Sequence, residues 1–540
     1  MLAFAPFGAA QAVLITSDAD SFLSAGRAVD VSGDTLVTSS VFAGCGGESN
    51  VGAAYAFVRA PASGTPGTWT EQQQLCGSTA VSSDRFGSSV AIEGDTIVVG
   101  SPDPFASGGP GLAYVFVRQG TSWAEQDELS ALDSQTSDEF GACVALSGDT
   151  AAASAPRDDT SAGAGAGSVY LFVRSGTAWS MEQKIEASDA GANDRFGGAL
   201  ALAGDVALVG AREHDGLAGN DTGAAYVFRR TGAVWSEEQQ LLASDAQAGD
   251  LFGASVALNE DRLIVGASRL TNPSDVPGKA YVFERQGTTW VETAVIQSPA
   301  PDNDGFGTSV DLLWDRCIVG APQVAGDSKA YLYRLVGTTW AEVDVLQQPF
   351  GDFFGNAVAL GDEIAVVGDP LGDDAFFKDN GIVYVYDVGT SSSFCDGSDG
   401  ALASCPCANV GHPTTGCDLA QGTGGVRMDI VTQQQGAQNR ATLVGSGYPV
   451  MSAPAVTVLR GSALDVSSPV PFGDGLRCVA SPVVRLAGTA ASGGQSTHTF
   501  GHGTMAGTGD FFYQLWFRNT PVMFCTPEAF NLSNGRSLTW

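Results

Sequence analysis

Acidic side chains that could bind a metal ion gather in three short stretches of this sequence, at 158–159, 213–221 and 373–379. Carboxylate oxygens are ligands that Ca²⁺ takes in proteins, so calcium is the one cofactor that these stretches suggest. The candidate ligands are Asp158, Asp159, Asp215, Asp221, Asp373, Asp374 and Asp379. Solvated acids on surface loops are the alternative interpretation, and it is the one we favour.

Catalytic chemistry finds little support in the residues. The sequence has four histidines, and the pair His498 and His502 lacks the adjacent Glu and the helical surroundings of a zinc-protease motif. No Gly-x-Ser-x-Gly nucleophile motif or nucleotide-binding fingerprint recurs. Turns such as 118–123 contain the Gly, Thr and Trp of a sialidase box but not its Asp. We therefore assign no catalytic and no cofactor-binding residue, and the sequence favours a protein that is not an enzyme.

The elements that would position a binding site come from an internal repeat. A Phe-Gly pair recurs six times, at steps of 54, 56, 56, 54 and 48 residues, and a degenerate Ala25-Gly26 precedes the six. The repeated residues are Phe86, Phe140, Phe196, Phe252, Phe306 and Phe354. This spacing predicts seven copies of one supersecondary unit.

Each unit contains four short segments with the alternating pattern of half-buried strands. In the second unit they are 89–92, 96–99, 113–116 and 123–129. Seven such units predict an all-β, seven-bladed β-propeller. The seventh unit has no outer strand of its own, but residues 11–18 resemble the outer strand at 239–245. We therefore expect the N-terminal strand to complete the last blade and close the ring.

The repeat resembles a known family. The Phe-Gly strand, the Gly-Ala-Pro-like endings at 319–322 and 99–102, and the Ala-Tyr-Val-Phe strand at 113–116 are similar to the FG-GAP repeat. That repeat builds the seven-bladed head of integrin α subunits and many bacterial extracellular proteins, and the resemblance covers residues 11–388. It implies an extracellular binding or adhesion protein.

The sequence departs from the calcium-binding members of that family. Their Asp-x-Asp-x-Asp-Gly loop is shortened here to turns such as Gly94-Asp95 and Gly148-Asp149, so the calcium ligands of the family cannot be transferred. An aspartate does precede each Phe by two residues, and we expect it to bond the backbone of its own turn. These residues are Asp84, Asp138, Asp194, Asp250, Asp304 and Asp352.

Cysteine usage indicates an oxidising compartment. Six of the ten cysteines fall in the last 150 residues, and such clustering of an even number predicts disulfides whose connectivity stays open. Cys45 and Cys76 belong to the first unit and could pair, whereas Cys143 and Cys317 are expected to be buried free thiols. The disulfide candidates are Cys45, Cys76, Cys395, Cys405, Cys407, Cys417, Cys478 and Cys525.

Charge and composition limit the kinds of partner that the protein can have. Nearly all of the net charge of −33 lies in the first 390 residues, which carry −32. Such an acidic chain repels nucleic acid and anionic lipid, so we expect no nucleic-acid partner. No apolar run approaches the roughly 18 residues of a membrane-spanning helix, so we expect no transmembrane segment.

The sequence divides into four regions. Residues 1–10 are apolar and resemble the remnant of an export signal, or are disordered. The propeller is expected over 11–388, a linker over 389–394, and a Cys-rich, β-sandwich-like domain over 395–540. Segments such as 394–397, 405–407 and 513–518 resemble a terminal module of large exported bacterial proteins, which implies association with the cell envelope.

The sequence thus favours a secreted or cell-surface protein that presents propeller loops to an extracellular protein or glycan. A propeller-based glycan hydrolase or lyase is one alternative, with converging carboxylates as its expected mark. A purely structural component of the surface or matrix is the other.

Overall fold

The chain forms two compact units, residues 1–388 and 389–540. The computed structural model describes residues 12–17, 24–59, 68–103, 109–259, 261–268, 277–299, 304–323, 328–348, 353–372 and 381–388 of the first unit, and the strands of the second. The described residues contain strands and no α-helix. Accordingly, no helix among them is long and apolar enough to cross a membrane.

The first six blades of unit one are each built from four consecutive antiparallel strands. Blade 1 contains β2 (Val29–Ser32), β3 (Thr35–Ser40), β4 (Ala53–Arg59) and β5 (Trp69–Leu75). Blade 2 contains β6 (Ser89–Glu93), β7 (Thr96–Ser101), β8 (Leu112–Gln119) and β9 (Ser122–Leu129). Blade 3 contains β10 (Val144–Ser147), β11 (Thr150–Ala155), β12 (Ser168–Ser175) and β13 (Ala178–Ile185).

Blades 4 to 6 repeat this order. Blade 4 contains β14 (Ala199–Ala203), β15 (Val206–Ala211), β16 (Ala224–Thr231) and β17 (Val234–Leu241). Blade 5 contains β18 (Phe252–Leu258), β19 (Arg262–Ala267), β20 (Lys279–Gln286) and β21 (Thr289–Gln297). Blade 6 contains β22 (Ser309–Leu313), β23 (Arg316–Ala321), β24 (Lys329–Val336) and β25 (Thr339–Gln347).

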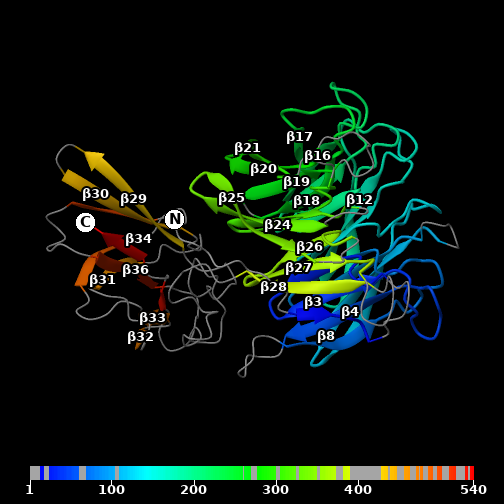
Figure 1. Ribbon diagram of the computed structural model, residues 1–540, viewed down its shortest axis with the longest axis horizontal. Coiled ribbons are helices and arrows are strands. Elements are labelled where there is room, and N and C mark those ends of the chain that lie inside the picture. The colour runs from blue at the N-terminus through cyan, green and yellow to red at the C-terminus, as the bar shows by residue number, and fades with distance from the viewer. Residues whose placement is uncertain are drawn as a thin grey trace. The chain divides into compact units, whose positions relative to one another are not determined.

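The seventh blade joins the two ends of the propeller sequence. Its strands β26 (Ala357–Leu360), β27 (Ile364–Asp369) and β28 (Ile382–Asp387) are completed by β1 (Ala12–Leu14), which pairs antiparallel with β28 so that Val13 lies opposite Tyr384. Figure 1 shows the yellow strands of this blade beside the blue strands of blade 1. The predicted seven-bladed ring and its closure by the N-terminal strand are both confirmed.

The second unit is described only by its strands. They are β29 (Arg427–Gln435), β30 (Gln438–Ser446), β31 (Ala455–Gly461), β32 (Val470–Phe472), β33 (Gly475–Arg477), β34 (Val484–Ala490), β35 (Ser496–Gly501), β36 (Asp510–Arg518), β37 (Phe530–Leu532) and β38 (Arg536–Thr539). Its predicted disulfide residues, Cys395, Cys405, Cys407, Cys417, Cys478 and Cys525, lie outside the described residues. The β-sandwich and its disulfides therefore remain predictions.

The apolar core of the propeller lies between neighbouring blades. Phe252 is fully buried and packs edge to face on Tyr281, with ring centroids 5.2 Å apart. The same cluster includes Val227 and Leu241 of blade 4, so the Phe joins two blades. The Phe residues of all six copies are buried in this way, as the repeat predicted.

The two glycines of the repeat meet at one contact between blades. A Cβ atom added to Gly266 of β19 would lie 2.2 Å from the carbonyl oxygen of Gly307, which follows the Phe of the next blade. The same approach, 2.0 to 2.2 Å, recurs at Gly100 with Gly141, Gly210 with Gly253, Gly320 with Gly355 and Gly368 with Gly26. In these five blades the main chain of the next blade leaves no room for a side chain at this position of the second strand, whereas blades 1 and 3 have Ser39 and Ser154 there.

We expect Gly266→Ala to lower the free energy of unfolding by about 3 kcal/mol, because its methyl group overlaps main chain that belongs to another blade. Gly287→Ala is the control: it has a φ of +69° but nothing within 4 Å of the new Cβ, so only backbone strain of about 1 kcal/mol is expected. Urea unfolding of both variants measures the difference. Equal destabilisation would show that the contact with Gly307 is unimportant.

Tryptophans of the outer strands link the blades at the rim. Trp123 donates its backbone N–H to Oε1 of Gln73 at 2.8 Å, and Nε2 of Gln73 donates to the Trp123 carbonyl at 2.9 Å. Gln183 with Trp235 and Gln239 with Trp290 repeat this reciprocal pair. Five of these tryptophans are buried within the blades: Trp69, Trp123, Trp179, Trp235 and Trp290.

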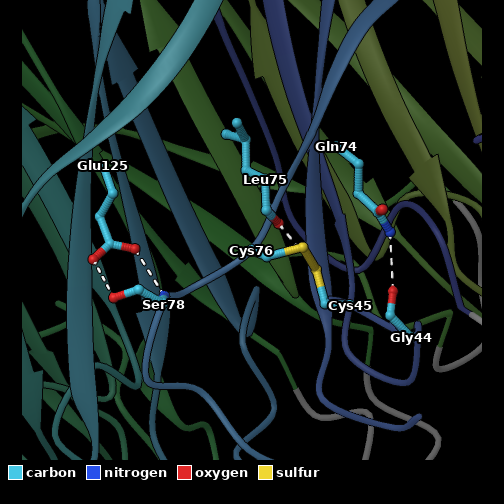
Figure 2. Close-up of a disulfide and its surroundings, with 7 residues drawn as sticks. All are labelled: Gly44, Cys45, Gln74, Leu75, Cys76, Ser78 and Glu125. Atoms are coloured by element: carbon cyan, nitrogen blue, oxygen red, sulfur yellow. Dashed lines mark hydrogen bonds between the residues drawn. A yellow bond between two sulfur atoms is a disulfide. The ribbon is translucent and has the colours of Figure 1, made fainter. Parts of the chain in front are cut away.

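A disulfide fastens a loop of blade 1. Cys45, in the connection from β3 to β4, is bonded to Cys76 at the end of β5, with Cα atoms 5.7 Å apart (Figure 2). Gln74 binds the same loop through the carbonyl of Gly44 at 3.0 Å. Cys143 and Cys317 are free thiols; Cys317 is fully buried, whereas Cys143 is half-buried, so the expected burial holds fully only for Cys317.

Candidate ligand-binding face

The propeller presents two faces with different connections. Because neighbouring strands are antiparallel, first-to-second and third-to-fourth connections emerge on one face, and in blade 2 they are the short turns 94–95 and 120–121. Second-to-third connections, and those to the next blade, emerge on the opposite face and are longer, as at 102–111 and 130–143. We call these the short-turn face and the long-loop face. Loops on a rigid scaffold are where binding residues concentrate.

Arginine neutralises the shortened turns of the short-turn face. Nε of Arg118 lies 2.8 Å from Oδ1 of Asp95, and Arg174 pairs with Asp149 at 2.7 Å. Arg334 pairs with Asp315 in the same way at 3.0 Å. A guanidinium from the third strand therefore supplies the positive charge at the turn where calcium-binding repeats hold their ion.

The aspartates before the Phe-Gly pairs stabilise the turns that lead into each blade. In four copies this aspartate accepts a hydrogen bond from the backbone N–H three residues earlier, at 2.5 to 2.8 Å. Those four are the half-buried Asp84 and the buried Asp138, Asp194 and Asp250. Asp304 instead accepts from Ser298 and from the Phe306 N–H, while Asp352 lies outside the described residues. The expected turn role is confirmed in the four.

The acids proposed as calcium ligands are held within their own loops. Asp158 is buried, and its carboxylate pairs with Nζ of Lys184 at 2.7 Å. Asp159 accepts the N–H of Gly165 at 2.9 Å.

Asp215 accepts the N–H of Asp221 at 2.9 Å, which ties the two candidate ligands of blade 4 to one loop. Within the described ranges, no three His, Cys, Asp or Glu residues are grouped to hold a metal ion. Asp373, Asp374 and Asp379 lie outside the described residues.

Two blade interfaces contain buried polar clusters that the sequence analysis missed. In blade 4, Nδ1 of His214 lies 2.9 Å from Oδ2 of Asp194, and the Tyr226 hydroxyl donates to Asp189 at 2.7 Å. In blade 3, Lys184 replaces the imidazole as the partner of the acids. Asp189 of the blade 4 cluster belongs to a Ser-Asp pair that recurs one repeat later at 244–245, and this is the sequence signal that could have revealed that cluster.

Four residues around the channel mouth adopt a left-handed backbone. They lie between the Asp and the Phe of the repeat, with φ values of 54° to 59°, although none is glycine. They are Arg85, Glu139, Arg195 and Leu251. Two of them reach the end of the second strand of their blade: Glu139 pairs with Arg157 at 3.0 Å, and Arg195 with Glu213 at 2.9 Å. The strained turn thus directs these side chains toward the long-loop face.

A polar pocket of about 380 Å³ opens on this face where blades 4, 5 and 6 meet. Hydroxyl groups of Ser268 and Thr308 lie 2.7 Å apart on one side. The lining also includes a guanidinium, two carboxylates and two apolar side chains: Arg212, Glu213, Asp221, Leu251 and Ala254. Such a pocket can donate and accept hydrogen bonds around a polar ligand and pack against its apolar face.

Two acids line the central channel. The same position of the innermost strand is alanine in five blades but Asp30 in blade 1 and Asp311 in blade 6. Each carboxylate accepts a backbone N–H from the next blade, that of Ile92 at 2.7 Å and that of Leu360 at 2.6 Å. Burial raises the pKa of Asp30 to about 7 and that of Asp311 to about 6.

These shifts predict that the two acids make the propeller more stable in mild acid. The ordinary pKa of Asp is 3.8, so between that value and about 7 folded Asp30 binds a proton that the unfolded chain has lost. This contribution is full below 3.8 and is lost as the pH rises through 7. We expect Asp30→Ala to lower the free energy of unfolding by about 1–2 kcal/mol more at pH 5 than at pH 8. Urea titrations of both proteins at the two pH values test this, and identical differences would contradict it.

The fold and its repeated unit define the class of this protein as a seven-bladed propeller of Phe-Gly repeats. Four stretches of the propeller match the FG-GAP repeat, at residues 69–116, 123–172, 179–228 and 235–283. Each match begins at an outer strand and ends in the third strand of the next blade. The sequence repeat is therefore offset from the blade by one strand, which is the offset that lets β1 close the ring.

Solved structures match the chain at low identity. A chain of the "Crystal Structure of Mitotic Checkpoint Complex" is 11% identical, with 72% of this chain and 97% of that chain covered and a TM-score of 0.43. A Lactobacillus plantarum protein is 10% identical over 63% and 90% of the two chains, with a TM-score of 0.43. Saccharomyces cerevisiae Sqt1 is 11% identical over 70% and 98%, with a TM-score of 0.37. No curated protein matches the chain in sequence.

Proposed function

We propose that this chain is a non-catalytic binding protein of the cell exterior, which holds a protein or glycan at its long-loop face. The observation that carries the proposal is the polar pocket at the junction of blades 4, 5 and 6. Its lining comes from three blades of a closed ring, so the ligand groups are held by a rigid frame. Rigid positioning lowers the entropic cost of binding.

The disulfide of blade 1 supports the extracellular setting, because disulfides are rare in the reducing cytosol. Cys45 and Cys76 are 31 positions apart, so their bond should contribute about 2–4 kcal/mol by restricting the unfolded chain. We expect dithiothreitol to lower the free energy of unfolding of the propeller, measured by urea titration, by the same amount. The double variant Cys45→Ala/Cys76→Ala is the control, and the reductant should not change the stability of its propeller.

Binding to arrayed extracellular proteins and glycans tests the proposed function. Leu251→Trp should fill the pocket and abolish specific capture by the full chain. Val336→Trp is the matched control, since Val336 is 62% exposed at a third-to-fourth connection on the short-turn face. Capture that survives Leu251→Trp would exclude this pocket as the binding site, and no specific capture at all would favour a structural matrix role.

A glycan hydrolase is the second candidate, and the raised pKa values of Asp30 and Asp311 are the observation that favours it. A general acid must hold its proton near neutral pH. Both carboxylates are nevertheless occupied by backbone N–H groups of neighbouring blades, which favours the binding function. If the protein released reducing ends from a glycan and Asp30→Ala did not, the hydrolase would become the favoured function.

A further inference from the structure

One long cationic side chain stands in the ring of residues that begin the innermost strands. The position after the repeat glycine is occupied by Arg27, Ser88, Ala142, Gly198, Ala254, Thr308 and Asn356 in the seven blades. Six of these side chains are short or absent, whereas Arg27 is long and exposed. The guanidinium of Arg27 therefore lies at the mouth of the channel among small neighbours.

Other guanidinium groups surround the same mouth. The pKa of Arg27 is lowered because the surrounding protein partly shields its guanidinium from water and because Arg85 carries a like charge nearby. Burial raises the pKa of the Cys143 thiol in blade 3, and both Arg212 and Arg27 lie close enough to oppose that shift. Arg27 thus lies near Arg85, and Arg27 and Arg212 both lie near Cys143, in a protein whose net charge is −33.

Carboxylates at the mouth are already engaged by other arginines. Glu139 pairs with Arg157 at 3.0 Å, and Glu213 lies 2.9 Å from Arg195 and 3.5 Å from Arg212. Among the described residues, no carboxylate forms an ion pair with Arg27. The charge of Arg27 is therefore not neutralised by any described carboxylate in an ion pair, and such a charge favours an anionic ligand.

The polar pocket adjoins this positive mouth through Arg212, which lines it. Its hydroxyl pair, Ser268 and Thr308, and its carboxylates, Glu213 and Asp221, offer both donors and acceptors. A sugar ring carries the matching hydroxyl groups and an apolar face for Leu251. An acidic peptide would satisfy the arginines but would leave most of these polar groups without partners.

From this arrangement we propose that the mouth binds an acidic glycan. Arg27 and Arg212 hold the carboxylate of a uronic acid residue, and the pocket between blades 4, 5 and 6 holds an adjoining sugar. Guanidinium and carboxylate groups match in geometry and can form two parallel hydrogen bonds. This inference rests on the proposed binding function and adds the chemical class of its ligand.

Calorimetric titration of the full chain with a short oligogalacturonate tests the inference, with its methyl ester as the uncharged analogue. We expect the acid to bind at least about tenfold more tightly than the ester, since a hydrogen bond to a charged group contributes about 1.5–3 kcal/mol and 1.4 kcal/mol is tenfold in affinity. Arg27→Gln/Arg212→Gln should remove that advantage. Arg334→Gln makes a matched charge change on the short-turn face and should leave it intact.

The outcomes separate this inference from the function on which it rests. Equal binding of acid and ester, or full binding by the double arginine variant, would overturn the acidic-glycan ligand and leave the binding function standing. Tighter binding of poly-glutamate than of oligogalacturonate would assign the mouth to an acidic peptide instead. Absence of binding by every probe would also overturn the inference, and array capture by the unmodified chain would then decide the proposed function alone. Thermal melting of each variant verifies its fold.

Discussion

Deletion of residues 11–17 is expected to lower the free energy of unfolding of the propeller by about 4–6 kcal/mol. The deletion removes β1, the fourth strand of blade 7, and with it Leu14, which is 6% exposed and packs in the core between blades 7 and 1. Loss of a buried Leu side chain costs about 2–5 kcal/mol. It also removes Ser17, whose N–H and hydroxyl bind the Glu71 carboxylate of blade 1 at 2.7 and 2.6 Å, and hydrogen bonds to charged groups contribute about 1.5–3 kcal/mol.

Two point variants divide this effect. Leu14→Ala should cost about 2–4 kcal/mol, whereas Val13→Ala, at a side chain 51% exposed, should change stability by less than about 0.5 kcal/mol. Differential scanning calorimetry of the three proteins measures the series. An unchanged melting temperature in the truncated protein would mean that β1 does not hold the ring closed.

The Ser17 contact is one copy of a repeated clamp between blades. Ser78 binds Glu125 through the same two groups at 2.8 and 2.7 Å, and Figure 2 shows this clamp beside the disulfide. Ser188 with Glu237 and Ser244 with Glu292 repeat it. Between blades 2 and 3 both partners change together, to Leu132 and Met181, which are exposed. Paired replacement of this kind indicates that the two positions act as a unit.

The architecture was predictable because it repeats. Phe252, its glycine and the closing strand each recur at fixed spacing, and a period of about 54 residues specifies a blade regardless of ligand. The arginines at the channel mouth were not predictable, because their positions do not repeat. Arg27, Arg85 and Arg212 occupy three different positions of the repeat and approach one another only when the ring closes. Similarly, Lys184 neutralises Asp158 from another strand, which no local pattern reveals.

The part of the chain that matches the family is also the part in which hydrogen bonds to tryptophan link neighbouring outer strands. Outer-strand partners of the next tryptophan are Gln73, Asp127, Gln183 and Gln239, and they connect blades 1 to 5. Ala294 takes the equivalent position in blade 5, and the indole N–H of Trp69 has no hydrogen-bond partner among the described residues. The matched residues, from 69 to 283, span the same five blades. Blades 6 and 7 therefore keep the packing residues of the repeat, but among the described residues neither takes part in such a bond to a tryptophan backbone N–H.

Phe252→Ala is the substitution that tests the packing core most directly, and we expect it to cost about 3–5 kcal/mol. The side chain is fully buried between Tyr281 and Phe283, with ring centroids 5.2 and 6.2 Å away. The surroundings cannot collapse into the cavity, because a Cβ atom on Gly223 would already lie 2.0 Å from the Phe252 carbonyl oxygen. Main chain from two blades is thus in contact beside the cavity.

Two variants are matched controls. Phe252→Leu should cost about 1–2 kcal/mol, because much of the side-chain volume remains. Leu217→Ala alters a fully exposed side chain and should change stability by less than about 0.5 kcal/mol. Urea unfolding followed by tryptophan fluorescence measures all three variants. Each blade contacts only its neighbours, but ring closure leaves no terminal blade from which unfolding can begin. The loss should therefore appear as one shifted transition of the whole propeller, and a separate transition of blades 4 and 5 would contradict the closed ring.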